Sequence, residues 1–183
     1  MQRDAETNDI ELMKRISAGD QHAFTVLMHR HLAGVVNFNK QYLSEEAEDI
    51  SQEAFIRLWN KAPEWEDKGI SPKAWLLRVS YNLCIDTLRK RKTVSLGHAA
   101  HALDIAANIA AQGNETESDF QQKIATLDRL PERQRSAITL CAYNGLNNKA
   151  AAKVMNISVD ALESLLARGR RKLRHLLNET ADD

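Results

Sequence analysis

The stretch from Ile157 to Leu177 constrains the fold most, because its apolar residues recur at the period of an α-helix over about six turns. On a helical wheel, one narrow stripe carries Leu162, Leu166, Gly169 and Leu173. The opposite face carries Asp160, Ser164, Ala167, Arg168, Arg171 and His175. The sequence therefore predicts a long helix that packs by one stripe and turns small and cationic side chains outward.

Turn and capping residues before this helix predict two shorter helices. Pro131 suits the start of the first, and Asn144-Gly145 suits its left-handed end. Asn147 can cap a second, short helix, and the turn Asn156-Ile157-Ser158 follows it, with Ser158 as the cap of the long helix. A short helix, a three-residue turn and a longer basic helix form a helix-turn-helix, whose second helix enters the major groove of DNA.

The outward face of the long helix suits such a groove. Short side chains allow close approach, and arginines reach phosphates or guanine edges. We therefore interpret Ser164, Arg168 and Arg171 as candidate DNA contacts. An amphipathic helix with a solvated basic face is the alternative that this pattern leaves open.

A second unusual helix is predicted from Ser71, its cap, and Pro72, its first residue, to Lys92. Most of its circumference is apolar, but one stripe at spacings of three and four carries Trp75, Arg78, Asn82, Asp86 and Arg89, and the basic end continues with Lys90 and Arg91. An aromatic ring, an amide and cations in line can stack exposed bases and hold a nucleic-acid backbone. The alternative places Trp75 in the core and the other residues at a wet domain edge.

The stretch from Thr93 to Asp119 is low in bulky apolar residues and ends in Gly, Asn, Thr and Ser, so it separates these two basic helices into different domains. The net charge is zero, but residues 71–95 carry 6 basic and 1 acidic residue, and residues 129–177 carry 10 and 3. Two basic blocks between acidic ones suggest two contacts with a polyanion. We predict an all-α protein with a helical domain at 1–92, a flexible linker at 93–118, a helix-turn-helix domain at 119–178 and an acidic tail at 179–183.

Several classes of protein are not supported. The N-terminus lacks the apolar region of a signal peptide, and no segment suits membrane insertion, so a cytoplasmic location is expected. Cys84 and Cys141 are isolated in apolar helical patterns, which is typical of reduced core thiols. His98 and His101 have no further ligands nearby, so we predict neither a metal site nor a cofactor.

A third helix, expected to start at a Ser44 cap, has a buried stripe of Ala47, Ile50, Ala54 and Leu58. Asp49, Gln52, Glu53 and Ile56 share another face. This face could receive a basic protein surface or could be solvated, and periodicity alone does not decide between the two.

Four segments in this order resemble the extracytoplasmic-function group of bacterial sigma factors: DQHAFTVLMHRH, EAEDISQEAFIRLW, SPKAWLLRVSYNLCIDTLRKRK and LPERQRSAITLCAYNGLNNKAAAKVMNISVDALESLLARGRRKL. The resemblance covers Asp20 to Leu177 except the linker. It implies a promoter-specificity subunit, not an enzyme, that binds core RNA polymerase at the β′ clamp and β flap, reads promoter DNA at −35 and −10 elements and promotes melting. It also implies an anti-sigma factor as a partner, and no appended regulatory domain is expected.

The resemblance implies a role for each face. The third helix would dock on the β′ clamp, with core-binding candidates Asp49, Gln52, Glu53 and Ile56. The second would hold the −10 element, with candidates Trp75, Arg78, Asn82, Arg89, Lys90 and Arg91, and with Asn82 beside the loop that captures a flipped base. The helix-turn-helix would read the −35 element, with candidates Asn148, Lys149, Ser164, Arg168 and Arg171.

The chain departs from the family pattern at the −35 reader. Glu163 and Leu165 stand where many members carry cations. Glu163 could accept a hydrogen bond from a cytosine amino group, or Glu163 and Arg170 could neutralise each other. Two rival functions remain: a regulator that binds an operator as a homodimer without polymerase, and an interaction protein whose basic faces bind an acidic protein.

Overall fold

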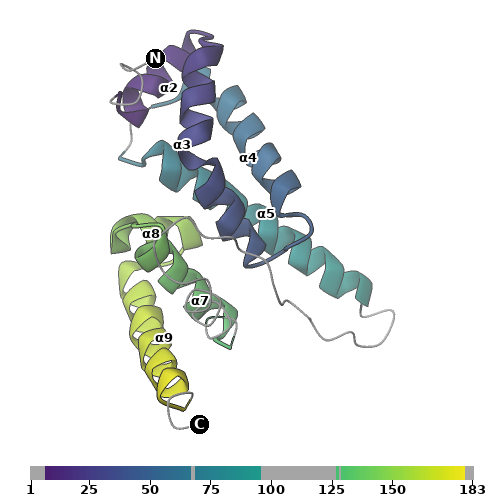
Figure 1. The fold of residues 1–183 in the computed structure, drawn as a ribbon, viewed down its shortest axis with the longest axis vertical. Coiled ribbons are helices and arrows are strands. Elements are labelled where there is room, and N and C mark those ends of the chain that lie inside the picture. Colours follow the sequence, from purple (N-terminus) through teal and green to yellow (C-terminus); the bar gives the residue numbers. More distant parts are fainter. Residues whose placement is uncertain (1–6, 67–68, 96–126, 128, 180–183) are drawn as a thin grey trace. The chain divides into compact units, whose positions relative to one another are not determined.

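The computed structural model describes residues 7–66, 69–95, 127 and 129–179, and these residues form helices and connecting turns without a β-strand (Figure 1). The chain divides into two compact units, residues 1–101 and 102–183. The prediction of an all-α fold is confirmed. The pair His98 and His101 and most of the predicted linker lie outside the described residues, although the last helix of the first unit continues beyond Lys92 to Ser95.

In the first unit, the described residues form a helical bundle of α2 (Asp9–Ser17), α3 (Gln21–Lys40), α4 (Ala47–Lys61), the 3₁₀ turn η1 (Ala62–Glu64) and α5 (Pro72–Ser95). Side-chain caps start three of the helices. The backbone N–H of Ala23 donates to Asp20 Oδ1 at 3.0 Å, and that of Ala74 donates to Ser71 Oγ at 3.2 Å, as predicted for Ser71. Asn8 caps α2 in the same way.

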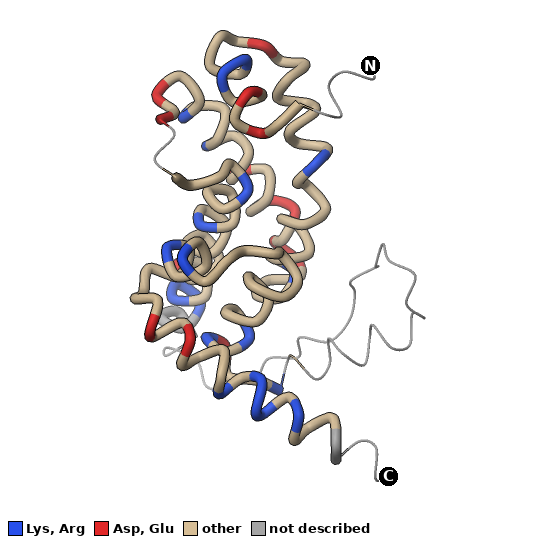
Figure 2. Tube along the Cα trace, turned by 90° about the vertical axis from the view of Figure 1, so that its left-hand side faces the viewer, with Lys and Arg blue, Asp and Glu red and all other residues tan. Residues whose placement is uncertain are grey.

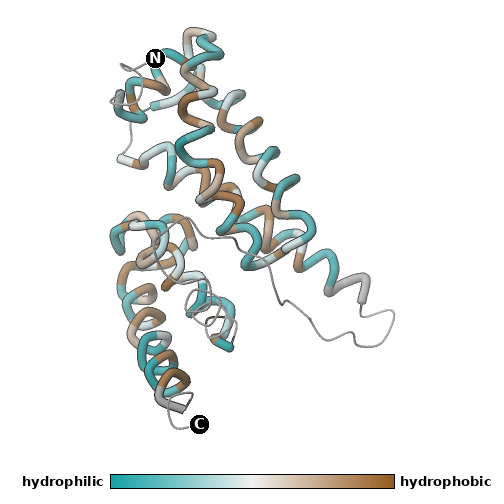
Figure 3. The backbone as a smooth tube through the Cα atoms, in the orientation of Figure 1, coloured by the Kyte–Doolittle hydropathy of each residue, from teal (hydrophilic) through white to brown (hydrophobic). Residues whose placement is uncertain are grey.

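The core of this unit lies where α3, α4 and α5 pack against one another, and α2 covers α3 and η1. Figure 3 shows apolar segments recurring along these helices. The predicted stripe of α4 is buried, as expected for Ala47, Ile50, Ala54 and Leu58. The predicted Ser44 cap is wrong: residues 44–46 form a turn, and α4 begins at Ala47 with Glu46 as a cap residue that makes no side-chain capping bond.

A small polar cluster joins the three central helices inside this core. The Asn39 amide donates to Ser51 Oγ at 2.9 Å, and Ser51 Oγ donates to the Ala47 carbonyl at 2.6 Å. The thiol of Cys84, on α5, lies 3.6 Å from Asn39 Oδ1. Burial raises the pKa of the Cys84 thiol to about 12, so it remains an S–H donor. The predicted buried, reduced thiol is confirmed at Cys84.

The second unit contains α7 (Glu132–Ile138), a π-helical turn η2 (Thr139–Tyr143), α8 (Asn148–Met155) and α9 (Val159–Glu179). The predicted caps are confirmed, because the N–H of Ala150 donates to Asn147 Oδ1 at 2.9 Å and that of Ala161 donates to Ser158 Oγ at 3.1 Å. The turns also match, with φ of +66° at Gly145 and 52° at Asn156. Pro131 precedes α7 as its cap residue rather than standing inside it.

The apolar stripe of α9 packs as predicted: Leu162, Leu166 and Gly169 are buried, and Leu173 is half-buried. Gly169 faces α7 closely. A Cβ atom at this position would lie only 2.7 Å from Ile138 Cδ1. The missing side chain therefore sets how near α7 and α9 can approach each other.

Candidate nucleic-acid and protein interfaces

The outward face of α9 is exposed, and it carries the predicted residues Asp160, Ser164, Ala167, Arg168, Arg171 and His175. The guanidinium of Arg168 donates from Nε to the backbone oxygen of Ser164 at 3.2 Å, which holds its stem along the helix. Figure 2 shows acidic residues in the first turns of α9 and basic residues farther along. Lys149, at the start of α8, is also exposed.

Asn148 connects α8 to α9 through side-chain hydrogen bonds. Its Nδ2 donates to Glu163 Oε1 at 3.1 Å, and its Oδ1 lies 3.9 Å from the Cys141 sulfur, within reach of the thiol. Of the two alternatives that the sequence left open for Glu163, the ion pair with Arg170 is not found among the described residues, and the carboxylate accepts a hydrogen bond from Asn148 instead. Cys141 is only half-buried, in contrast to the predicted core position.

The polar stripe of α5 passes gradually from the core into solvent. Trp75 and Arg78 are half-buried, whereas Asn82, Arg89 and Lys90 are exposed. The Trp75 ring meets Trp65 edge to face, with centroids 6.1 Å apart, and packs against the core of the unit. The stripe therefore offers an aromatic wall at one end and amide and cationic groups toward the other.

Arg91 at the end of this stripe has a partner that the sequence did not indicate. Its guanidinium forms an ion pair with Glu46, at the start of α4. The two residues are 45 positions apart, so no local pattern could reveal the pair. This contact ties the beginning of α4 to the basic end of α5.

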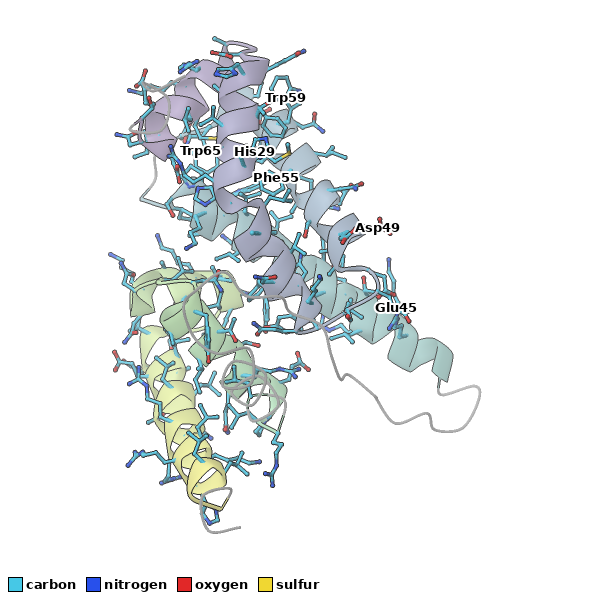
Figure 4. The ribbon with its side chains drawn as sticks, in the orientation of Figure 1. His29, Glu45, Asp49, Phe55, Trp59 and Trp65 are labelled. Carbon is cyan, nitrogen blue, oxygen red and sulfur yellow. The ribbon has the colours of Figure 1, made fainter. Side chains whose placement is uncertain are left out.

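The outer face of α4 combines acid and apolar groups. Asp49 and Gln52 are exposed, and Ile56 leaves 54% of its surface in solvent. Glu53 is half-buried and accepts from Arg57 Nε at 2.7 Å. The four predicted residues thus lie at the surface of α4, and Figure 4 shows Asp49 on this helix, apart from Phe55 and Trp59.

A groove of about 490 Å³ runs beside Ile56, between α3 and α4. Its lining is Phe24, Met28, Leu32, Val36, Glu48, Gln52, Phe55 and Ile56. Sequence reasoning missed the α3 side of this groove, although its four apolar residues recur at intervals of four. That spacing alone predicts a helix face, and only the packed bundle shows that part of the face stays open.

Comparisons with known proteins agree with this arrangement. Family models described as Sigma-70 region 2 and Sigma-70, region 4 match residues 27–94 and 122–173. The RNA polymerase sigma factor NccH of Alcaligenes xylosoxydans xylosoxydans is 30% identical, over 94% of this chain and 96% of that protein. The ECF RNA polymerase sigma factor SigW of Bacillus subtilis is also 30% identical, over 91% and 95%. The chain belongs to the extracytoplasmic-function sigma factors.

A solved structure supports the same membership of this sigma factor. The sigma factor RpoE from Bartonella quintana, in complex with the anti-sigma factor NepR, is similar with a TM-score of 0.74 and 25% identity, over 85% of this chain and 96% of that one. The predicted sigma-factor function is confirmed, and a homodimeric operator-binding regulator is not favoured.

The two region matches divide the candidate surfaces of the sigma factor. The faces of α4 and α5 fall within region 2, and those of α8 and of α9 as far as Arg171 fall within region 4. Among the described residues, no group of three or more His, Cys, Asp or Glu side chains is placed to hold a metal ion. None of the described helices is both long and apolar enough to cross a membrane.

Proposed function

We propose that this sigma factor binds core RNA polymerase through the outer face of α4 and reads promoter DNA with α5 and α9. The observation that carries the proposal is the exposure of cations on one face of α9, the second helix of a helix-turn-helix. A solvated basic helix would explain the charge alone. It would not explain why small residues, Ser164 and Ala167, share the same face.

The proposed polymerase contact is the face of α4 formed by Asp49, Gln52, Glu53 and Ile56. Ile56 and the neighbouring groove offer apolar area, and the acids around them suit a basic helix such as one of the β′ clamp. The β flap is the second proposed contact on polymerase. The same protein-binding role makes α4 a target for an anti-sigma factor, because a partner that covers this face would exclude polymerase.

The proposed −10 contact is the stripe of α5, with Trp75, Arg78, Asn82, Arg89, Lys90 and Arg91. Extruding a base from duplex DNA costs a few kcal/mol, which stacking and phosphate contacts must offset. The half-buried Trp75 packs against Trp65 and the core of the unit, so it suits the wall of a base pocket better than an inserted wedge. If Arg91 contacts the DNA, its ion pair with Glu46 must be replaced by one with a phosphate.

The proposed −35 contact is the outward face of α9, with Ser164, Arg168 and Arg171, together with Lys149 at the start of α8. Asn148 belongs to the same surface, although its described bonds are to protein groups. We place the protein in the cytoplasm, where promoter DNA and polymerase are found, and we assign it no catalytic role or cofactor.

The test is transcription from a promoter library by purified core polymerase with and without this chain. New start sites that appear only with the chain support the proposal, and an unchanged set of start sites refutes it. The free chain is expected to bind promoter duplexes poorly and to select them only with polymerase.

Two single variants separate the proposed DNA contacts. Arg168→Ala removes a cation from the α9 face. If Arg168 contacts a base, the variant should weaken binding of the −35 element by the holoenzyme by about 1–3 kcal/mol. Asn82→Ala should leave duplex binding unchanged and slow promoter opening, measured with a fluorescent base in the −10 element. The reverse pattern would refute both assignments.

A further inference from the structure

Glu163 is an acid on a surface that is otherwise built for a polyanion. It is exposed in the second turn of α9, one residue before Ser164 and close to Asn148 and Lys149 of α8. DNA phosphates repel a carboxylate, so an acid here weakens sequence-independent binding. A carboxylate on such a surface strengthens DNA binding only where the DNA presents a hydrogen-bond donor to it.

The carboxylate is held in place by a short relay across three elements. The Cys141 thiol of η2 reaches Asn148 Oδ1 on α8, and Asn148 Nδ2 donates to Glu163 Oε1 on α9. Burial raises the pKa of the Cys141 thiol and outweighs the charge of Arg170, which lowers it. Because the pKa is raised, the sulfur stays protonated and can donate a hydrogen bond. The amide can only turn its NH₂ group toward the acid, because its oxygen would be repelled.

This relay leaves acceptor capacity on the exposed Glu163 carboxylate. A carboxylate accepts about four hydrogen bonds on its two oxygens, and Asn148 supplies one. In the major groove the base-edge donors are the amino groups of cytosine N4 and adenine N6, and glutamate characteristically accepts from cytosine N4. The first turns of a recognition helix are the part that meets base edges.

We infer that Glu163 is a specificity-determining residue of the −35 reader, which selects a cytosine by accepting a hydrogen bond from its N4 amino group, and that Asn148 is a positioning residue that orients the carboxylate. The inference rests on the proposed function, because it requires α9 to enter the groove. It also changes the expected role of Asn148 from a DNA contact to a support for one.

The experiment uses the full chain with core polymerase and a promoter library randomised across the −35 element. Bound promoters are separated and sequenced, and base preferences are compared position by position. The wild-type holoenzyme should enrich cytosine at one position. Glu163→Ala should lower that enrichment at least about fivefold and leave the other positions unchanged.

Two further variants give results that a purely structural role would not produce. Glu163→Arg should shift the preference at the same position from cytosine to guanine, whose O6 and N7 accept from arginine. Asn148→Ala should reduce the cytosine preference at that position by a smaller factor, because the carboxylate remains but is no longer held. The matched control is Glu132→Gln, which changes an exposed acid at the start of α7 and should alter no base preference.

The outcomes are distinguishable. If the wild-type holoenzyme selects no −35 sequence at all, the proposed function fails and the inference fails with it. If it selects a sequence and the Glu163 variants keep the same preference at every position, the inference alone is overturned. A uniform loss of affinity across all positions also overturns the inference, because Glu163 would then serve only to connect α9 to α8.

The variant Glu163→Gln covers the case in which the alanine variant does not fold. It keeps the side-chain length and can still accept a hydrogen bond from Asn148. Its preference for cytosine should fall, while adenine becomes acceptable.

Discussion

At the scale of single residues, Asp9 shows how two side chains of another helix fix one carboxylate. Arg30 Nη1 donates to Asp9 Oδ1 at 2.6 Å, and His31 Nε2 lies 2.6 Å from Asp9 Oδ2. Burial raises the pKa of Asp9, but hydrogen bonds and charge from His31 and Arg30 outweigh it, and the pKa is lowered. The ionised form therefore stabilises the folded state above the unfolded-state pKa of about 3.9, and this contribution disappears as the pH falls through the lower folded value.

The variant Asp9→Asn tests this contribution. At neutral pH it should reduce the free energy of unfolding of the first unit by about 1–2 kcal/mol, because hydrogen bonds to a charged group are lost. Urea unfolding followed by tryptophan fluorescence reports this unit alone, since all 3 tryptophans of the chain, Trp59, Trp65 and Trp75, belong to it. The difference from wild type should shrink as the pH falls below the unfolded-state pKa of about 3.9 and then through the lower folded-state value. A difference that stays constant with pH, or an equal effect of the exposed control Glu48→Gln, would contradict the ionic origin.

At the scale of elements, the contact between α7 and α9 depends on Gly169. Because a Cβ there would meet Ile138 Cδ1 at 2.7 Å, Gly169→Ala forces the Ile138 side chain to move. Alanine also favours the helix by up to about 1 kcal/mol, which opposes this cost. The net effect of the single variant therefore mixes two terms, and a second variant is needed to separate them.

Ile138→Val supplies that separation, because it removes the Cδ1 atom while its remaining branch keeps an ordinary contact. Gly169→Ala should be more favourable in the Ile138→Val background than in wild type by at least about 0.5 kcal/mol. Hydrogen exchange of the α7 and α9 amides in the full chain measures the stability of this packing. The matched control pairs Ile138→Val with Ala167→Ser, an exposed change on α9, and the effects of these two changes should be additive. Additivity for Gly169→Ala as well would show that the close approach carries no energetic cost.

The elements also show which parts of this molecule a sequence can predict. Caps such as Ser71, Asn147 and Ser158 act over three residues, and helical stripes repeat every three or four, so both follow from local pattern. The failed Ser44 cap lies at a turn whose geometry depends on where α3 ends and α4 packs. The pairs Glu46–Arg91 and Asn148–Glu163 join residues 45 and 15 positions apart, and they require the packed bundle to be known.

At the scale of the whole molecule, a net charge of zero results from opposite charges placed on different surfaces. The outer face of α4 is acidic beside an apolar groove, and the outward face of α9 is basic beside small residues. Because the two faces belong to separate units, each should respond to its own partner and not to the total charge.

A pair of charge reversals tests this independence. Asp49→Lys puts a cation on the α4 face and should weaken binding to core polymerase about tenfold or more, because like charges then meet at the docking surface. It should leave the sequence preference at the −35 element unchanged. Arg168→Glu should have the opposite effect, because the chain keeps its affinity for polymerase and loses −35 binding.

The double variant has the same net charge as wild type. If total charge governed the chain, the double variant would regain polymerase binding and −35 binding, whereas we expect it to show both defects together. The measurements are polymerase affinity by fluorescence anisotropy and −35 selection by the holoenzyme, for wild type, both single variants and the double variant. Recovery of either activity in the double variant would contradict the independence of the two surfaces.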